Sequence, residues 1–224
     1  MNGEVILQAT FFLGGLAVLI LAWRMRRLNR KPRLPGVSWW ATGYAAIGLA
    51  AIGVGADFYY GDWIKGFATH LLLTGGVAVV WMGTHLFLEG RPGRLAVSVS
   101  CALLAGEALG VFWFYYIDPA YQVRLTLTCV VLLILSANLS MTLFLSSMDN
   151  RAVTAAGVCY SLFALFNGLR TIAILIHPER LAYYLSGTLA VVVTALMPLS
   201  LVAAQVAALY MLRDAARQRT RKAD

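Results

Sequence analysis

Seven apolar runs, each about as long as a membrane-spanning helix, occupy most of this 224-residue chain. They cover roughly residues 4–23, 38–57, 64–88, 95–117, 121–146, 152–176 and 183–211. A transmembrane helix needs about 20 mostly apolar residues, because the hydrocarbon core of a bilayer is about 30 Å thick. Only 12% of the residues are charged, against about 25% in soluble domains. We therefore predict an all-α membrane protein, a multi-pass bundle of seven transmembrane helices.

Positive charge is spread unevenly over the segments between these runs. Fourteen Lys and Arg residues fall in segments 24–33, 91–94, 151 and 213–222, whereas three, Lys65, Arg124 and Arg180, fall in the other segments. Cytoplasmic segments carry the excess of Lys and Arg in membrane proteins. The pattern predicts an N-terminus outside and a C-terminus in the cytoplasm. Because topology accounts for the net charge of +8, we expect no nucleic-acid partner.

The signatures of membrane enzymes and pigments are not found in the sequence. The last span has no lysine for a retinal Schiff base, and three histidines cannot ligate two haems. Neither HExxH nor GxSxG occurs. Glu107 is the single acid within a span, so paired-carboxylate chemistry is not expected. We therefore predict no catalytic residue, no metal site and no cofactor in this chain.

A small polar set lies inside the predicted spans. The stretch LFALFNGLRTIAILI, residues 162–176, holds Arg170 with Asn167 one helical turn before it. From the ends of their spans, Glu107 and Arg170 lie about 16 and 10 Å below the outer surface, and His70 enters the same outer half. Glu107 and Arg170 can therefore reach each other if their helices are neighbours.

Three interpretations of Arg170 remain open. A charge near mid-bilayer costs about 2.5–3.5 kcal/mol, so such residues usually pair or face a cavity. Arg170 either extends its guanidinium to the outer head groups, or forms a structural pair with Glu107, or recognises an acidic or carbonyl ligand in an outward-open pocket. On the last interpretation Glu107, Arg170, Asn167 and His70 are the candidate ligand-binding or signalling residues.

Small residues and one proline suggest how the helices pack and bend. The second run reads GYAAIGLAAIGVG, and the fourth carries Ala102, Gly106 and Gly110 at intervals of four. Such residues let helices approach closely, so we expect contacts within the bundle, with a homodimer interface as the alternative. Pro198, inside the last run, is a candidate hinge. The helix-forming, basic residues 212–224 predict a cytoplasmic helical extension after a transmembrane domain of residues 1–211.

The chain resembles a known kind of membrane domain along most of its length. The segments that carry the resemblance are LAWRMRRLNRKPRLPGVSWWATGYAAIGLAAIGVG, DWI, THLFLEGRPGR and DNRAVTAAGVCYSLFALFNGLRTIAIL. They are similar to the seven-helix membrane sensor region that precedes GGDEF domains in bacterial diguanylate cyclases. The resemblance implies residence in the bacterial inner membrane and a last helix that leads into a dimeric cytosolic cyclase domain. No GGDEF signature occurs here, so the chain itself is not expected to be an enzyme.

Together these features predict a sensory input domain for cyclic di-GMP signalling. It would respond to a small amphipathic or acidic ligand from the outer side, or to the state of the lipid bilayer, and relay the response through its last helix to an output domain. The alternative is a small transporter or channel-like protein that uses a Glu107–Arg170 pair, although no inverted repeat is visible. A purely structural membrane protein is the third hypothesis.

Overall fold

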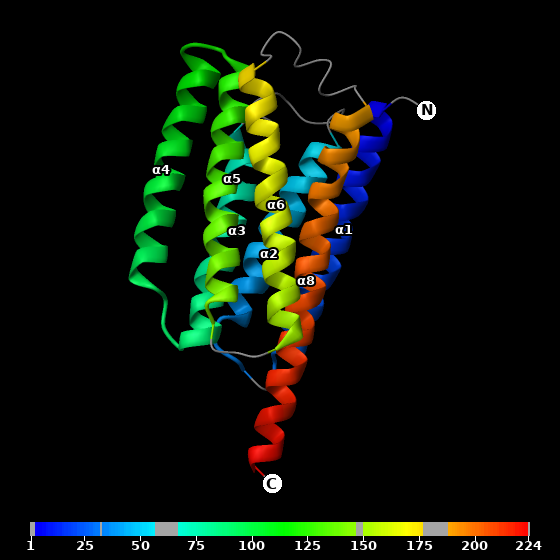
Figure 1. The fold of residues 1–224 in the computed structure, drawn as a ribbon, viewed down its shortest axis with the longest axis vertical. Coiled ribbons are helices and arrows are strands. Elements are labelled where there is room, and N and C mark those ends of the chain that lie inside the picture. The colour runs from blue at the N-terminus through cyan, green and yellow to red at the C-terminus, as the bar shows by residue number, and fades with distance from the viewer. Residues whose placement is uncertain (1–2, 32, 57–66, 147–149, 177–187, 224) are drawn as a thin grey trace.

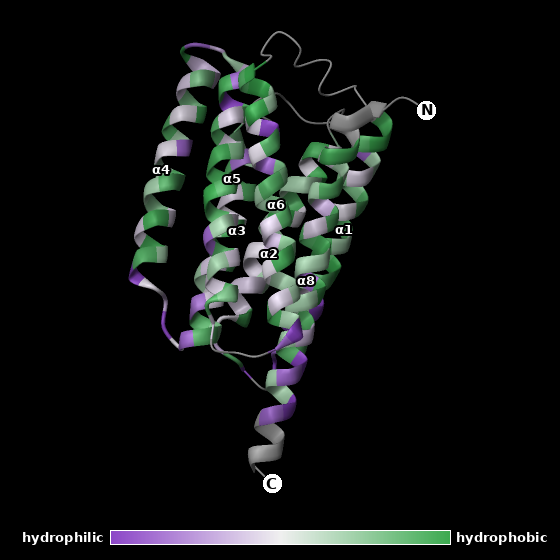
Figure 2. Ribbon diagram, viewed as in Figure 1, coloured by the Kyte–Doolittle hydropathy of each residue, from purple (hydrophilic) through white to green (hydrophobic). Residues whose placement is uncertain are grey.

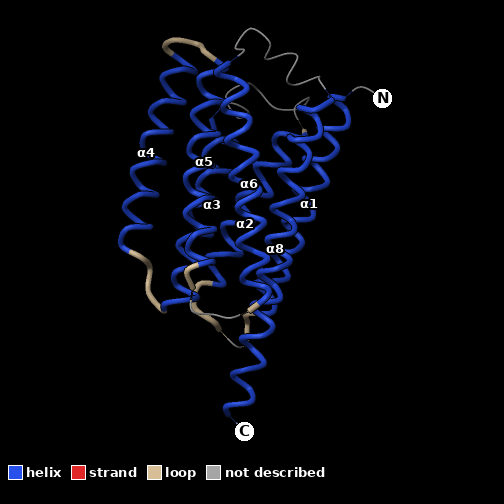
Figure 3. The backbone as a smooth tube through the Cα atoms, in the orientation of Figure 1, coloured by secondary structure: helices blue, strands red, loops and turns tan. Residues whose placement is uncertain are grey.

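The structure is a computed structural model that describes residues 3–31, 33–56, 67–146, 150–176 and 188–223 (Figure 1). These ranges contain helices and no strand (Figure 3). The helices are α1 (Gly3–Leu28), α2 (Val37–Gly55), α3 (Thr69–Glu89), α4 (Arg94–Tyr116), α5 (Tyr121–Phe144), α6 (Arg151–Ile176) and α8 (Thr188–Ala223). Each of the seven is long and apolar enough to cross a membrane. The predicted all-α fold with seven membrane-length helices is therefore confirmed.

Two helices, α1 and α8, continue well past the ends of the predicted runs. α1 continues five residues past the predicted end at residue 23, and Arg26 and Arg27 lie in its last turn. Basic side chains are favourable there because the carbonyl end of a helix carries partial negative charge. α8 continues through the predicted extension to Ala223. Lys65 and Arg180, which were counted among the outer basic residues in predicting the orientation, lie outside the described residues.

Six of the seven described helices form a closed ring, and α4 lies outside it. In the ring α1 packs on α2, α2 on α3, α3 on α5, α5 on α6, α6 on α8, and α8 returns to α1. α4 packs against α3 and α5 at the edge of the bundle (Figure 1). The helices that carry Glu107 and Arg170 are therefore not neighbours, because α5 lies between them.

Glycines bring α2 very close to both of its neighbours. A Cβ atom placed on Gly43 would lie 2.6 Å from the carbonyl oxygen of Gly76 in α3. A Cβ atom on Gly48 would lie 2.9 Å from the carbonyl oxygen of Gly15 in α1. In a membrane, apolar side chains gain little by leaving lipid, so the close packing of the two backbones supplies the energy that holds the helices together. The predicted packing role of the small residues in α2 is confirmed.

The small residues of α4 behave differently. Gly110 packs on Leu127 of α5, whereas Ala102 is exposed and Gly106 has no neighbouring atom within 4 Å of a built Cβ. The prediction of an internal contact is therefore wrong for Ala102 and Gly106. The reason is the position of α4 outside the ring, which leaves only one face of this helix in contact with the bundle.

The lower half of the ring, towards the end of the bundle from which α8 emerges, has a packed interior. The hydroxyls of Tyr44 in α2 and Tyr160 in α6 lie 2.6 Å apart, and both side chains are buried. The indole N–H of Trp40 donates to the hydroxyl of Thr84 in α3 at 3.0 Å. These pairs satisfy polar atoms that would be costly to bury alone. Aromatic rings therefore close the centre of the ring at this level.

The outer surface of the bundle is apolar. Leu13, Leu49, Leu109 and Leu165, on four different helices, are all more than half exposed. Figure 2 shows hydrophobic residues along the helix bodies and hydrophilic ones concentrated at the lower end and in the emerging part of α8. This surface is what a multi-pass membrane protein presents to lipid.

Candidate functional site

The upper half of the ring, nearer the start of α1, contains a cavity of about 940 Å³. All six ring helices line it, and α4 adds Tyr115. Ala50, Ala51, Gly53 and Thr194 give part of its wall short side chains, and several aromatic rings, including Phe11 and Phe163, line the rest. Ligand pockets usually measure about 300–1,000 Å³, so the space accommodates a drug-sized molecule.

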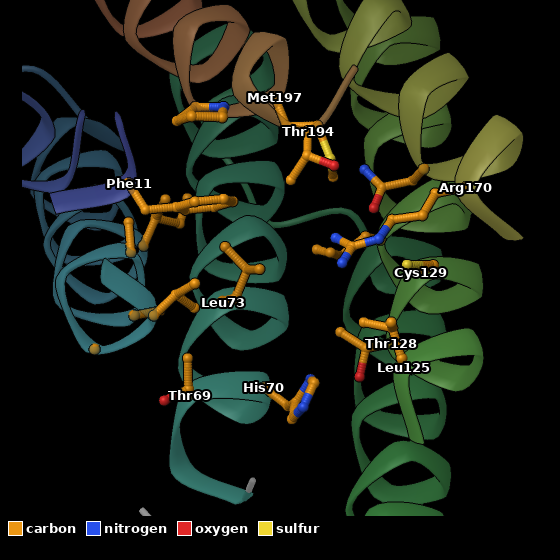
Figure 4. A pocket seen from close by; sticks show the side chains of 18 of the residues that line it. Phe11, Thr69, His70, Leu73, Leu125, Thr128, Cys129, Arg170, Thr194 and Met197 are labelled. Carbon is orange, nitrogen blue, oxygen red and sulfur yellow. The ribbon is translucent and has the colours of Figure 1, made fainter. Parts of the chain in front are cut away.

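Arg170 projects from α6 into this cavity. Figure 4 shows its guanidinium and the ring of His70, from α3, pointing into the same space. Among the described residues, no hydrogen-bond or ion-pair partner contacts the guanidinium. The side chain is directed into the ring rather than towards lipid. This arrangement favours the pocket interpretation over extension to the head groups.

Glu107 lies behind the cavity wall and not on it. Its carboxyl is almost fully buried, with 1% of the residue exposed, and Oε1 accepts a hydrogen bond from the Thr128 hydroxyl at 2.9 Å. Thr74 of α3 lies beside the same carboxyl. No ion pair links Glu107 to Arg170, both of which the structure describes. The predicted pair is not formed, because its two helices lie on opposite sides of α5.

Asn167 lines the cavity one helical turn from Arg170. The residue is completely buried, and its Nδ2 donates to the carbonyl oxygen of Phe163 at 2.8 Å. Its Oδ1 has no hydrogen-bond partner among the described residues. Leaving a buried acceptor unsatisfied costs about 1–3 kcal/mol. The amide oxygen is therefore an unsatisfied acceptor in a residue that lines the cavity.

A second arginine lies at the upper edge of the cavity. The guanidinium carbon of Arg124 is 4.6 Å from the ring centroid of Tyr115 and 5.5 Å from that of Tyr121. Cation–π contacts of this kind fix a guanidinium while leaving its charge in place. Arg124, Arg170 and His70 line the same cavity. Arg124 was not predicted as a site residue, although Tyr121, three residues before it on the same helix, was a usable signal.

The cavity is positive at its upper end and apolar below. Its described lining holds Arg124, Arg170 and His70 but no Asp or Glu. Leu132 and Phe163 belong to the deeper wall. Among the described residues, no three His, Cys, Asp or Glu side chains are close enough together to hold a metal ion. The arrangement suits binding of an anionic, partly apolar molecule.

Pro198, the predicted hinge, also lines the cavity. It lies inside α8, and a Cβ built on Gly14 of α1 would lie 3.1 Å from its own Cβ. Proline has no backbone N–H, so one hydrogen bond of α8 is lost at the level of the cavity. The role of Pro198 as a hinge remains a prediction.

No protein family, curated protein or solved structure matches this chain. The resemblance to the sensor regions of diguanylate cyclases therefore remains a prediction.

Proposed function

We propose that this chain is a membrane-embedded sensory domain that binds a ligand in the upper cavity and relays binding through α8. One observation carries the proposal: α8 forms part of the cavity wall through Thr194, Met197 and Leu201, and the same helix continues to Ala223. A helix that spans both places links occupancy of the cavity to the position of its far end. The weakened hydrogen bonding at Pro198 supplies a point where α8 can bend.

In the proposed orientation the cavity faces the outside and α8 enters the cytoplasm. The basic residues near the lower end, including Arg26, Arg27 and Arg213, support this orientation because cytoplasmic segments are rich in Lys and Arg. The exposed leucines of the helix bodies support insertion in a lipid bilayer. Residence in the bacterial inner membrane is proposed from the family resemblance alone.

The same resemblance supports a proposal about the output. We take α8 to lead into a cytosolic diguanylate cyclase domain that works as a dimer, which places the chain in cyclic di-GMP signalling. A ligand changes such an output only through different affinities for two helix arrangements. We assign sensing to this chain and catalysis to the output domain.

The transporter hypothesis is less well supported. It relied on an intramembrane pair of Glu107 and Arg170, and these two groups are not paired. Glu107 instead accepts a hydrogen bond from Thr128 behind the cavity wall. The sensor proposal needs only the cavity and the continuous α8.

Spin-label distances across the lower end of the bundle test the relay. Labels at Leu145→Cys, after α5, and Arg213→Cys, in α8, occupy exposed positions. The background carries Cys101→Ser and Cys159→Ser, whereas the buried Cys129 is retained. We expect dodecanoate or dodecanol, as anionic and neutral probes, to shift this distance by about 1–2 Å in lipid nanodiscs.

A matched pair of labels controls for a general effect on the bilayer. Leu145→Cys with Leu28→Cys spans the same lower end without including α8, and Leu28 is exposed. This control distance should stay constant when a probe binds. An unchanged distance to α8 at saturation with both probes, or equal shifts in the two pairs, contradicts the sensor proposal.

A further inference from the structure

We infer that the cavity takes a single-chain amphiphile with one acidic head group and a hydrogen-bond donor close to that group. The inference rests on the proposed function for the location of the ligand site. The head group would contact Arg170 and Arg124, the donor would reach Asn167, and the chain would extend between α2, α5, α6 and α8 towards the centre of the bundle.

The charge of the head group follows from the lining of the cavity. Arg170 and Arg124 bring two guanidinium groups to one space, and no carboxylate is among the described lining residues. Charged side chains within a membrane span usually pair or face a polar cavity, and no described acid pairs with Arg170. Guanidinium groups bind carboxylate and phosphate through paired hydrogen bonds. The partner that the site lacks is therefore an anion.

The hydrogen-bond donor follows from Asn167. Its Oδ1 is buried and unsatisfied among the described residues, while its Nδ2 is occupied by the carbonyl of Phe163. Asn167 precedes Arg170 by three residues, which corresponds to about 4.5 Å along the helix. A hydroxyl or amide N–H one or two carbons from the acidic group spans this distance. A β-hydroxy acid and an N-acyl amino acid both carry such a donor.

The single chain follows from the deeper wall. Phe163 lies seven residues below Arg170 on α6, about 10 Å along the axis, and Leu132 and Leu201 line the cavity with it. Below this level the buried Tyr44–Tyr160 pair fills the centre of the ring. The space therefore accepts an apolar chain of limited length and ends at an aromatic floor.

Calorimetric titration of the full chain in phosphatidylcholine nanodiscs tests the inference, with empty nanodiscs as the blank. The probes are 3-hydroxydodecanoate, dodecanoate, dodecanol and dodecyltrimethylammonium. We expect affinity to fall about 3–10-fold without the hydroxyl and a further 10–100-fold without the carboxylate. The cationic probe should not bind. Equal affinity for dodecanol and dodecanoate overturns the assignment of an anionic head group.

Matched variants on the same helices identify the contacts. Arg170→Gln should weaken 3-hydroxydodecanoate about 10–100-fold. Arg170→Lys keeps the charge but not the paired N–H donors, so it should weaken binding less than Arg170→Gln does. Arg151→Gln, at the exposed start of α6 and outside the cavity, should leave it unchanged. If Arg170→Gln binds as tightly as Arg151→Gln while both remain folded by circular dichroism, the proposed head-group contact is wrong.

The role of Asn167 has its own control. Asn138 in α5 makes the same contact to the carbonyl four residues earlier, at 2.8 Å, but does not line the cavity. Asn167→Leu should abolish the preference for the hydroxylated probe and leave affinity for dodecanoate within about twofold. Asn138→Leu should preserve the preference. A preference that survives Asn167→Leu contradicts the assigned donor contact.

The same chemistry occurs in free hydroxy acids and in acidic single-chain lipids of the membrane. Competition with lysophosphatidic acid, which carries one chain, a hydroxyl and a phosphate, separates the two sources. Displacement of 3-hydroxydodecanoate assigns the site to a membrane lipid, and no displacement assigns it to a free carboxylic acid.

If 3-hydroxydodecanoate binds but leaves the distance from α8 to α5 unchanged, the ligand class stands and the sensor function fails. If only dodecanol moves α8, the sensor function stands and the assigned ligand class is wrong.

Discussion

Gly76→Leu is expected to lower the free energy of unfolding by about 3 kcal/mol or more, the largest stability effect we predict for one residue. A Cβ atom on Gly76 would lie 2.7 Å from the carbonyl oxygen of Gly43, which is backbone and cannot turn aside. The added side chain must therefore force α2 and α3 apart and break their packing. Unfolding of the purified chain by sodium dodecyl sulfate, followed by circular dichroism, measures the loss.

The neighbouring glycine provides the control. Gly75 lies on the same helix, and a Cβ atom built there has no neighbouring atom within 4 Å. Gly75→Leu should change stability by less than about 1 kcal/mol, because the added side chain enters open space beside the helix. Equal losses for Gly75→Leu and Gly76→Leu would show that α2 and α3 do not pack through these glycines.

Thr194→Trp is expected to weaken binding of 3-hydroxydodecanoate by at least about 100-fold, the largest effect we predict on ligand binding. Thr194 projects from α8 into the cavity (Figure 4), and the indole would occupy space that the apolar chain needs. A tryptophan buries about 150–250 Å² of surface, so the protein should remain folded and gain packing contacts. Titration calorimetry measures binding, and circular dichroism checks the fold.

Val192→Trp makes the same substitution on the other face of α8. Val192 is 48% exposed and does not line the cavity, so binding should stay within about twofold of the unaltered chain. Unimpaired binding to Thr194→Trp would place the ligand elsewhere on the protein. Equal impairment by both variants would point to a general disturbance of α8.

The helices themselves were predictable from the sequence because the bilayer sets their length and composition. Residues 95–117 and 152–176, for example, became α4 and α6 with ends shifted by one residue at most. The order of helices around the ring was not predictable, because hydropathy states how long a helix is but not which neighbour it contacts. Small-residue spacing identified the contacts of Gly43 and Gly48 correctly and failed for Gly106.

The candidate site was predicted in part, because the bilayer also fixes how deep each polar residue lies along its helix. Depth along the helices placed Arg170 and His70 in the same outer half, and helical spacing placed Asn167 beside Arg170; the structure brings all three to one cavity. Depth alone also placed Glu107 at a similar level, but the intervening α5 keeps it from Arg170. Arg124 was not predicted as a site residue, because a basic residue at the end of a span is normally explained by topology.

The cavity itself had no signature in the sequence. Gly53 and Thr194 line it at the upper level of the ring, whereas the buried Tyr44 and Tyr160 meet at the lower level. Those residues lie on three separate helices whose adjacency only the fold establishes. In the ring of helices, the cationic lining of the cavity and the unsatisfied Asn167 indicate that Arg170 binds a ligand, and do not indicate a purely structural role.

Photolabelling tests most directly whether the upper cavity is the ligand site. A dodecanoate that carries a diazirine on its chain is bound to the full chain in nanodiscs, irradiated, and its adducts are mapped by peptide mass spectrometry. We predict adducts within residues 125–132, 163–170 and 194–201, which excess 3-hydroxydodecanoate removes. Adducts confined to lipid-facing positions such as Leu109, and insensitive to that competitor, would contradict it.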